Sequence, residues 1–327
     1  MTTRRVLVTG GAGFIGSHLV EALLARGDHV TVIDDLSTGR WANLEHVAAD
    51  PRLRVIVASA AERDLLEREV PGHDLVYHLA SAVGVRLVVD QPVRTVETIF
   101  LGTHVVLAAA ARYRRPVVLT STSEVYGNSP RVPFREDDDV VMGPTEKRRW
   151  AYACAKALDE FLALAHFTET RLPVYVVRLF NTVGPRQSPH YGMVLPSFVR
   201  RALEGRPLEV YGTGEQRRCF CHVADVVEGL LRLPEVEAAR GKVINLGSQE
   251  EVTIRGLAER VLALTGSASP IELVSYEAAY GQGFDDMQRR VPDLERARTL
   301  LGWAPRTRLD DTIRAVVESW RAEQAGP

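Results

Sequence analysis

A glycine-rich turn between an apolar strand and an amphipathic helix constrains this chain more than any other feature. Gly10, Gly13 and Gly16 follow directly after residues 4–9, which read as a short buried strand, and residues 15–26 then show apolar side chains at helical spacing. Gly10 permits a tight turn, Gly13 lets the backbone approach a pyrophosphate, and Gly16 lets the helix pack on the strand. Because the N-terminus of that helix would face the phosphates, the pattern predicts a dinucleotide site on a parallel α/β sheet.

A second expected strand, residues 30–34, ends in an acidic residue. Asp34 lies at the distance along the chain expected for a carboxylate that accepts hydrogen bonds from the adenosine ribose hydroxyls. Since this carboxylate would repel a 2′-phosphate, the sequence predicts NAD rather than NADP as the cofactor; Arg40 is the only nearby cation that would offset the bias. The acidic strand end also weighs against the alternative of a glycine-rich turn that binds no ligand.

Tyr152 and Lys156 are four residues apart, so on a helix both side chains lie on one face, one turn apart. A phenol normally keeps its proton up to about pH 10, and an adjacent ammonium and a cationic nicotinamide both favour the phenolate. A tyrosine so placed can take the proton of a substrate hydroxyl while hydride leaves the same carbon for the cofactor. Such pairs also occur on ordinary helix surfaces, but the position downstream of the glycine turn indicates catalysis.

Strand-like and helix-like segments alternate up to about residue 180, which predicts an α/β fold with a doubly wound parallel (Rossmann) sheet. The expected strands are 54–58, 75–79, 116–120 and 174–179, and the longer expected helices are 88–112 and 146–168. After Gly184 and Pro185 the elements become shorter and less regular. We therefore predict an NAD-binding Rossmann domain over residues 1–184, to which 218–246 returns, and a smaller, discontinuous α/β substrate-binding domain over 185–217 and 247–327.

Composition and charge exclude several classes of protein. The 327 residues carry a formal net charge of −2, so the chain lacks the excess of positive charge that is typical of proteins that bind nucleic acid. No apolar run reaches the roughly eighteen residues of a membrane span, and Met1 lies close to the first expected strand, so we expect a cytoplasmic protein without a membrane segment. The three cysteines show no disulfide pattern, and Cys219-x-Cys221-His222 is too closely spaced for the usual zinc sites, so no metal is expected.

Six segments together resemble the extended short-chain dehydrogenase/reductase family, in its group of nucleotide-sugar epimerases, dehydratases and decarboxylases. These segments are residues 9–16, 76–80, 121–127, 152–156, 178–186 and 210–214, and the resemblance covers nearly the whole chain. Sugar 4,6-dehydratases resemble Thr-Asp-Glu where this chain has Thr122-Ser123-Glu124, and simple 4-epimerases usually lack the acid at Glu124. The form seen here is similar to UDP-glucuronate decarboxylases (UDP-xylose synthases).

Residues 143–150 and 285–293 also resemble decarboxylases of this group, although the second segment alone reads equally well as a solvated, charged loop. The resemblance implies that NAD oxidises the sugar C4 hydroxyl of UDP-glucuronate, with Lys156 lowering the pKa of the base Tyr152. The C5 carboxylate then belongs to a β-keto acid and leaves as carbon dioxide, giving UDP-xylose or, on early release, a UDP-4-keto-pentose. The catalytic residues implied are Tyr152, Lys156, Thr122, Ser123, Glu124 and Arg290.

The resemblance also implies the residues that bind the two ligands. Those expected for NAD are Gly10, Gly13, Phe14, Ile15, Gly16, Asp34, Ser37, Thr38, Leu79, Ala80, Tyr152 and Lys156. Those expected for the nucleotide sugar are Asn181 at the diphosphate or sugar, Val210 and Tyr211 beside the uracil, Arg218 on a phosphate and Arg290 on the carboxylate. Two positions depart from the family pattern: Ala60-Ala61 replaces an Asp that commonly contacts adenine, and Ile99 stands near the usual active-site Asn.

Two other functions remain compatible with the sequence. A UDP-hexose or UDP-glucuronate 4-epimerase needs the same Tyr152, Lys156 and NAD but gives no role to Glu124 or Arg290. A catalytically silent NAD-binding regulatory protein would not need the intact tyrosine–lysine pair. Because the family pairs two long helices between subunits, the alanine-rich residues 88–112 and 146–168 predict a homodimer. The sequence leaves the choice between UDP and dTDP open.

Overall fold

The computed structural model describes residues 3–82, 90–189, 192–280 and 287–325. Its main sheet has seven parallel strands in the order β11-β6-β5-β4-β1-β2-β3. These strands are β1 (Arg5–Thr9), β2 (His29–Asp34), β3 (Leu53–Val57), β4 (Leu75–His78), β5 (Val117–Thr122), β6 (Val174–Leu179) and β11 (Lys242–Leu246). Most of their apolar side chains are buried, as is typical of a parallel sheet covered on both faces.

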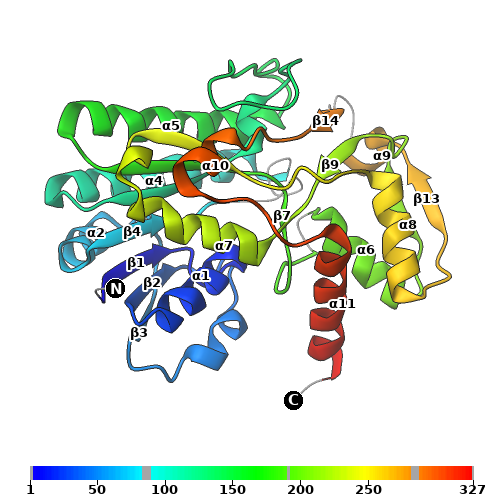
Figure 1. Ribbon diagram of the computed structural model, residues 1–327, viewed down its shortest axis with the longest axis horizontal. Helices are drawn as coiled ribbons and strands as arrows, with labels where there is room; N and C mark the ends of the chain where they lie inside the picture. The colour runs from blue at the N-terminus through cyan, green and yellow to red at the C-terminus, as the bar shows by residue number, and fades with distance from the viewer. Residues whose placement is uncertain (1–2, 83–89, 190–191, 281–286, 326–327) are drawn as a thin grey trace.

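Helices cover both faces of this sheet (Figure 1). On one face, α1 (Phe14–Ala25), α7 (Val223–Arg232) and α10 (Glu295–Leu301) enclose a core that includes Leu19 and Trp303. On the other face, α2 (Arg63–Glu69), α4 (Pro92–Tyr113) and α5 (Trp150–Thr170) enclose a second core. Among the described helices, α4 alone is long and apolar enough to cross a membrane by length and composition, yet half of its most apolar window is buried inside the protein.

The second part of the chain builds a smaller layer beside the carboxyl ends of the main strands, on the right in Figure 1. Its core lies between α6 (Val194–Leu203), α8 (Ile254–Thr265) and α11 (Leu309–Ala325). Three small sheets complete it: β8 (Leu208–Tyr211) with β13 (Ile271–Val274); β9 (Arg217–Cys219) with β12 (Glu251–Thr253) and β14 (Arg289–Arg290); and β7 (Thr182–Val183) with β10 (Cys221–His222). The short helix α9 (Tyr276–Tyr280) lies beyond β13.

The predicted Rossmann architecture is confirmed, and the expected strands agree with the observed ones to within two residues. The expected helix 88–112 corresponds to α4, although residues 88 and 89 lie outside the described residues, and the expected helix 146–168 begins later, at Trp150. Within the segment 218–246, α7 and β11 join the Rossmann layer, whereas Arg218 pairs in the three-stranded sheet with β12 and β14. The division into two domains stays a prediction.

Candidate active site

A cleft of about 1130 Å³ opens between the carboxyl edge of the main sheet and the smaller layer. This is where open α/β sheets bind their ligands, because the loops after parallel strands meet at that edge. Nearly all predicted site residues line it: Gly10, Gly13, Phe14, Ile15, Gly16, Asp34, Ser37, Thr38, Leu79, Ala80, Thr122, Ser123, Glu124, Tyr152, Lys156, Asn181, Tyr211, Arg218 and Arg290.

Val210 is the exception: it does not line the cleft, and its place beside the uracil stays a prediction. It is fully buried in the core of the smaller layer, whereas its neighbours Glu209 and Tyr211 line the cleft. Successive side chains of a strand point to opposite faces, so the side chains of Val210 and Tyr211 lie on different faces of β8. Asn181 lines the cleft while donating from Nδ2 to the Cys219 carbonyl at 2.8 Å.

The glycine turn is shaped for a close approach of backbone to ligand. Gly10 has φ +73°, and a Cβ there would lie 2.6 Å from the Ala80 nitrogen. A Cβ on Gly16 would lie 2.1 Å from the Gly10 carbonyl oxygen, so helix and strand pack closely only with glycine. A Cβ on Gly13, in contrast, would meet only that same oxygen, at 3.1 Å. Gly13 therefore leaves room on its cleft side, at the first turn of α1, where phosphates are favoured.

Asp34, at the end of β2, lies beside the glycine turn and bonds its backbone. Its Oδ2 accepts from the Ala12 nitrogen and its Oδ1 from the Leu36 nitrogen, each at 2.9 Å. Burial raises the pKa of this carboxyl group, and the two backbone hydrogen bonds act in the opposite direction. Each carboxylate oxygen has a second lone pair, so Asp34 can still accept from ribose hydroxyls. Ala60 and Ala61 line the cleft nearby and offer only apolar side chains to an adenine.

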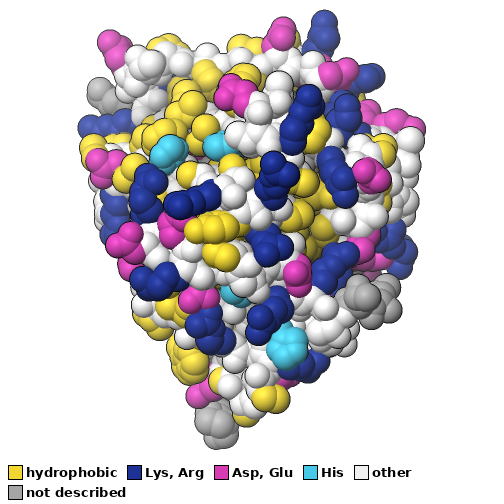
Figure 2. All heavy atoms as spheres, turned by 90° about the vertical axis from the view of Figure 1, so that its left-hand side faces the viewer, with side chains coloured by type: hydrophobic (Ala, Val, Ile, Leu, Met, Phe, Trp, Pro, Cys, Tyr) yellow, Lys and Arg dark blue, Asp and Glu magenta, His cyan; other side chains and the backbone are white. Residues whose placement is uncertain are grey.

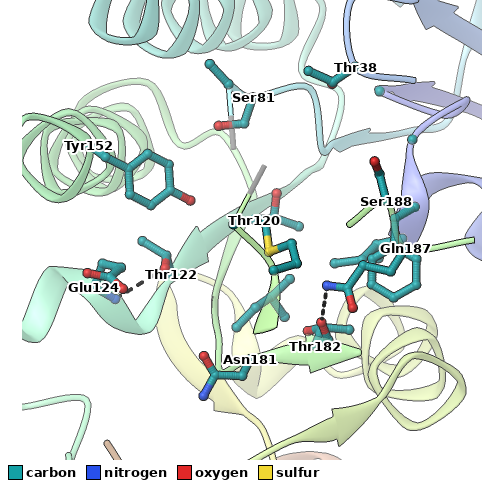
Figure 3. Close-up of a pocket in the computed structure, with 18 of the residues that line it drawn as sticks. Thr38, Ser81, Thr120, Thr122, Glu124, Tyr152, Asn181, Thr182, Gln187 and Ser188 are labelled. Carbon is teal, nitrogen blue, oxygen red and sulfur yellow. Dashed lines mark hydrogen bonds between the residues drawn. The ribbon is translucent and has the colours of Figure 1, made fainter. Parts of the chain in front are cut away.

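Tyr152 points into the cleft from α5, toward Thr122 at the end of β5 (Figure 3). Burial raises the pKa of the Tyr152 phenol, the negative charge of Glu124 adds to this, and a hydrogen bond with Thr122 lowers it. Lys156 is not among the main causes of this shift, and the lowering of the Tyr152 pKa by Lys156 together with NAD stays a prediction. Lys156 Nζ donates to Asp159 Oδ2 at 2.8 Å, and both side chains are buried.

Glu124 lines the cleft and forms ion pairs with two arginines. It lies in the 3₁₀ turn η4 (Ser123–Tyr126), which Thr122 caps by accepting from the Glu124 nitrogen at 3.2 Å. Arg290 Nη1 donates to Glu124 Oε1, and Arg149 Nη2 donates to Oε2 at 2.9 Å. Burial alone would raise the pKa of Glu124, but the two guanidinium groups lower it to about 2. Glu124 is therefore a carboxylate at neutral pH.

Arg290 reaches this position from the three-stranded sheet. The parallel pair β9–β14 sets Arg290 beside Arg218, and both residues line the cleft. Next to it, Arg289 makes a two-pronged ion pair with Glu251 of β12, which fixes the short strand β14. Arg290 Nη1 also lies 3.5 Å from Ser123 Oγ, and its buried Nε has no hydrogen-bond partner among the described residues. Arg290 thus reaches the cleft with its guanidinium already bonded to Glu124.

Sequence reasoning missed three residues of the site. Arg149 lies three residues before Tyr152 and stacks over Trp150 at 5.1 Å; this helical spacing was the available signal. Asp159, one turn after Lys156, carried the same signal. Ser81 lines the cleft with a buried hydroxyl that has no partner among the described residues, and nothing in the local sequence marks it.

A Rossmann sheet whose glycine turn, acidic strand end and Tyr152–Lys156 pair share one cleft defines a dinucleotide-dependent enzyme of the short-chain dehydrogenase/reductase type. The chain belongs to the nucleotide-sugar group of the extended short-chain dehydrogenases/reductases: the family model described as GDP-mannose 4,6 dehydratase matches residues 7–316. The predicted family is thereby confirmed.

Individual relatives narrow the comparison. The chain is 38% identical over 319 residues to a UDP-N-acetyl-alpha-D-glucosaminuronate decarboxylase of Bacillus cytotoxicus, covering 97% of this chain and 98% of the relative. It is 36% identical to UDP-glucuronic acid decarboxylase 1 of Xenopus tropicalis, covering 98% of this chain and 73% of the relative. Among solved structures, it is similar to the dTDP-glucose 4,6-dehydratase DesIV of Streptomyces venezuelae with NAD and TYD bound, at 32% identity and a TM-score of 0.89, covering 98% of each chain.

Proposed function

We propose that this protein is an NAD-dependent decarboxylase of UDP-glucuronate that works through a 4-keto sugar and gives UDP-xylose, a UDP-4-keto-pentose, or both. The carrying observation is the Glu124 carboxylate, held by Arg290 and Arg149 in the same cleft as Tyr152. Hydride transfer at C4 needs the tyrosine but not this charged cluster. Guanidinium groups beside a cleft suit a substrate that carries a carboxylate. The names of the relatives in Bacillus and Xenopus support the same reaction class.

The residues present fit a bound NAD. The glycine turn leaves space at the start of α1, and the Asp34 carboxylate suits free ribose hydroxyls rather than a 2′-phosphate. When bound, NAD supplies an acceptor for the C4 hydride of the sugar and returns that hydride later. Phe14, Ile15, Ser37, Thr38, Leu79 and Ala80 complete the proposed cofactor site.

The protein's own groups handle the proton at C4. Tyr152 takes the proton of the C4 hydroxyl as general base, and Lys156 supports it from the next turn of α5. Thr122, the last residue of β5, or Ser123, the first of η4, bonds the same oxygen. Because burial raises the pKa of Tyr152, the base needs positive charge nearby when substrate is bound.

Loss of carbon dioxide then follows from the chemistry of the substrate. The C4 ketone makes the C5 carboxylate part of a β-keto acid, so the carbon–carbon bond breaks and its electron pair passes into the C4 oxygen as an enolate. Tyr152 and Ser123 are placed to stabilise that oxygen, and losing one such donor typically costs about 3 kcal/mol of barrier. Arg290 orients the leaving carboxylate, and the Glu124 carboxylate beside it accepts a hydrogen bond from the water that delivers the proton to C5.

Substrate anchoring is assigned to the smaller layer. We assign Asn181 to the diphosphate or sugar, Tyr211 to the uracil and Arg218 to a phosphate, since all three line the cleft beside β8 and β9. The Rossmann part thus binds NAD and the smaller layer binds the nucleotide sugar, as the sequence boundaries predict. We also place the enzyme in the cytoplasm, where its three free cysteines stay reduced.

We further propose a homodimer through α4 and α5. Hydrophobic side chains gather over these helices in the upper part of the face shown in Figure 2. The exposed ones include Val93, Val96 and Leu101 on α4, and Leu158 and Phe161 on α5; Phe161 is 68% exposed. Two copies that pack these helices together would bury an apolar surface that is otherwise in contact with water.

Incubation with NAD and UDP-glucuronate, followed by measurement of carbon dioxide and of the sugar product, tests the function directly. UDP-N-acetylglucosaminuronate is run in parallel, because the Bacillus relative carries that name. Carbon dioxide from either substrate supports a decarboxylase and identifies the sugar. Conversion of UDP-glucuronate to its C4 epimer without carbon dioxide would instead establish the 4-epimerase.

A further inference from the structure

Asn245 hydrogen-bonds three separate segments: the turn η4, the residues that follow Arg290 and the residues around Phe134. It is fully buried in β11, at the edge of the main sheet beside β6. Its Oδ1 accepts from the Tyr126 hydroxyl at 2.7 Å, and its Nδ2 donates to the carbonyls of Phe134 and Asp293, at 3.0 and 3.2 Å. Both donors and the acceptor oxygen of this amide are therefore engaged.

The first of these segments carries Glu124. Tyr126 ends η4, which begins with Ser123 and Glu124. Its ring stacks on Phe134 with centroids 4.7 Å apart, and the Arg178 guanidinium lies 4.6 Å over it. Burial raises the pKa of Tyr126, so its hydroxyl stays protonated and donates. The position of η4 is thus fixed through the tyrosine.

The second segment carries Arg290. Directly after Arg290, the Val291 carbonyl accepts from the Phe134 nitrogen at 2.8 Å, and the Asp293 nitrogen donates back to the Phe134 carbonyl at 2.8 Å. The Asn245 amide bonds this junction at two of its carbonyls. One side chain therefore holds both the turn that bears Glu124 and the strand that bears Arg290.

We infer that Asn245, through Tyr126, is a positioning residue that sets the register of Glu124 against Arg290. Neither of the two segments carries Tyr152, which stands on α5. The pair acts chiefly on the step at the sugar carboxylate because, of the groups proposed at the C4 oxygen, η4 carries only Ser123 and not the base Tyr152. This inference rests on the proposed decarboxylase function. A misplacement of about 1 Å costs roughly a hundredfold in rate, so a shift of η4 against β14 is sufficient to impair the reaction.

The test separates the two half-reactions in Tyr126→Phe, which removes one hydroxyl, and in Asn245→Asp, which keeps the acceptor but loses both N–H donors. Tyr77→Phe is the matched control, because Tyr77 is equally buried and its hydroxyl donates only to the Leu230 carbonyl, at 3.2 Å. We expect carbon dioxide release from UDP-glucuronate to fall roughly ten- to a hundredfold in the first two variants. The rate of NADH formation should fall by a smaller factor than carbon dioxide release in these two variants, and both rates should stay within about twofold of the parent in Tyr77→Phe.

An unchanged ratio of carbon dioxide to NADH in both Tyr126→Phe and Asn245→Asp overturns the inference, as does an equal fall of both rates, which would indicate general destabilisation. If the parent itself releases no carbon dioxide, the proposed function fails, and a crystal structure of Tyr126→Phe then decides the inference alone. Loss of the contact between Arg290 and Glu124 in that crystal structure supports it, whereas a retained contact with unchanged geometry overturns it.

Discussion

Arg290 donates a hydrogen bond from Nη1 to Oε1 of Glu124, although 166 residues separate the two in the chain. Glu124 follows β5 of the main sheet, and Arg290 stands on β14 of the three-stranded sheet. Their contact joins the two layers across the cleft, next to the general base proposed for C4. The carboxylate chemistry and the hydride chemistry therefore rest on different side chains and can be separated by mutation.

Glu124→Gln should uncouple oxidation from decarboxylation. The amide lacks the negative charge that holds Arg290 in place, so the substrate carboxylate loses its orientation and carbon dioxide release should fall by about two orders of magnitude or more, while NADH absorbance still develops on addition of UDP-glucuronate. Arg290→Lys keeps the positive charge but loses the forked pair of guanidinium N–H donors. A large loss of carbon dioxide release in this variant would indicate that Arg290 acts by orienting the carboxylate rather than by charge alone. Parent-like carbon dioxide release by both variants would contradict the roles given to these residues.

Tyr152→Phe should abolish both half-reactions, because no hydride step begins without a base at the C4 hydroxyl. Tyr113→Phe is the matched control, since the Tyr113 hydroxyl bonds Glu67 on the outer surface. Stopped-flow absorbance of the reduced nicotinamide measures the step, and we expect at least a hundredfold loss in Tyr152→Phe only. Equal rates in the two variants would remove Tyr152 from the mechanism.

The ion pairs of Glu124 with Arg290 and Arg149 should also affect the stability of the protein at acidic pH. Its pKa is about 2 in the folded protein against an ordinary value of 4.5. A lowered pKa contributes stability that is present above pH 4.5 and is lost as the pH falls toward 2. The difference in the free energy of unfolding between the parent and Glu124→Gln should therefore be largest at about pH 6. It should shrink as the pH is lowered from about 4.5 toward about 2. Urea unfolding of both proteins at several pH values measures it; a difference independent of pH would contradict the lowered pKa.

Asp34 should make the protein prefer NAD to NADP by at least about tenfold in affinity, or roughly 1.4 kcal/mol. Its carboxylate lies at the end of β2 and would repel a 2′-phosphate. Fluorescence titration of the two cofactors gives the ratio. Equal dissociation constants for the two cofactors would contradict the prediction.

Phe161→Glu should dissociate the proposed dimer, because it places a charge in the exposed apolar face of α5. Light scattering at micromolar concentration should give a dimer for the parent and a monomer for the variant. Leu273→Glu is the control, since Leu273 is 57% exposed on β13, outside the proposed interface. A parent that is monomeric under these conditions would contradict the proposal.

The sequence alone determined the Rossmann layer and the cofactor end of the cleft, because these depend on local patterns. The glycines of the turn are required by backbone crowding within a few residues, and Asp34 follows from the strand that precedes it. The spacing of Tyr152 and Lys156 likewise places both on one helix face. Arg290, which the family resemblance implies as a site residue, also lines the cleft.

Only the tertiary structure decided how these residues interact. In the folded protein Lys156 pairs with Asp159, and Arg149 donates to Glu124. The Val210 side chain lies in the core of the smaller layer. Asn245 bonds segments that are far apart in the chain. Sequence spacing cannot supply these contacts, because they join elements that are far apart in the chain and depend on sheet register and strand faces. The pKa values of Tyr152 and Glu124 follow from the same packing, since burial and neighbouring charges are properties of the folded chain.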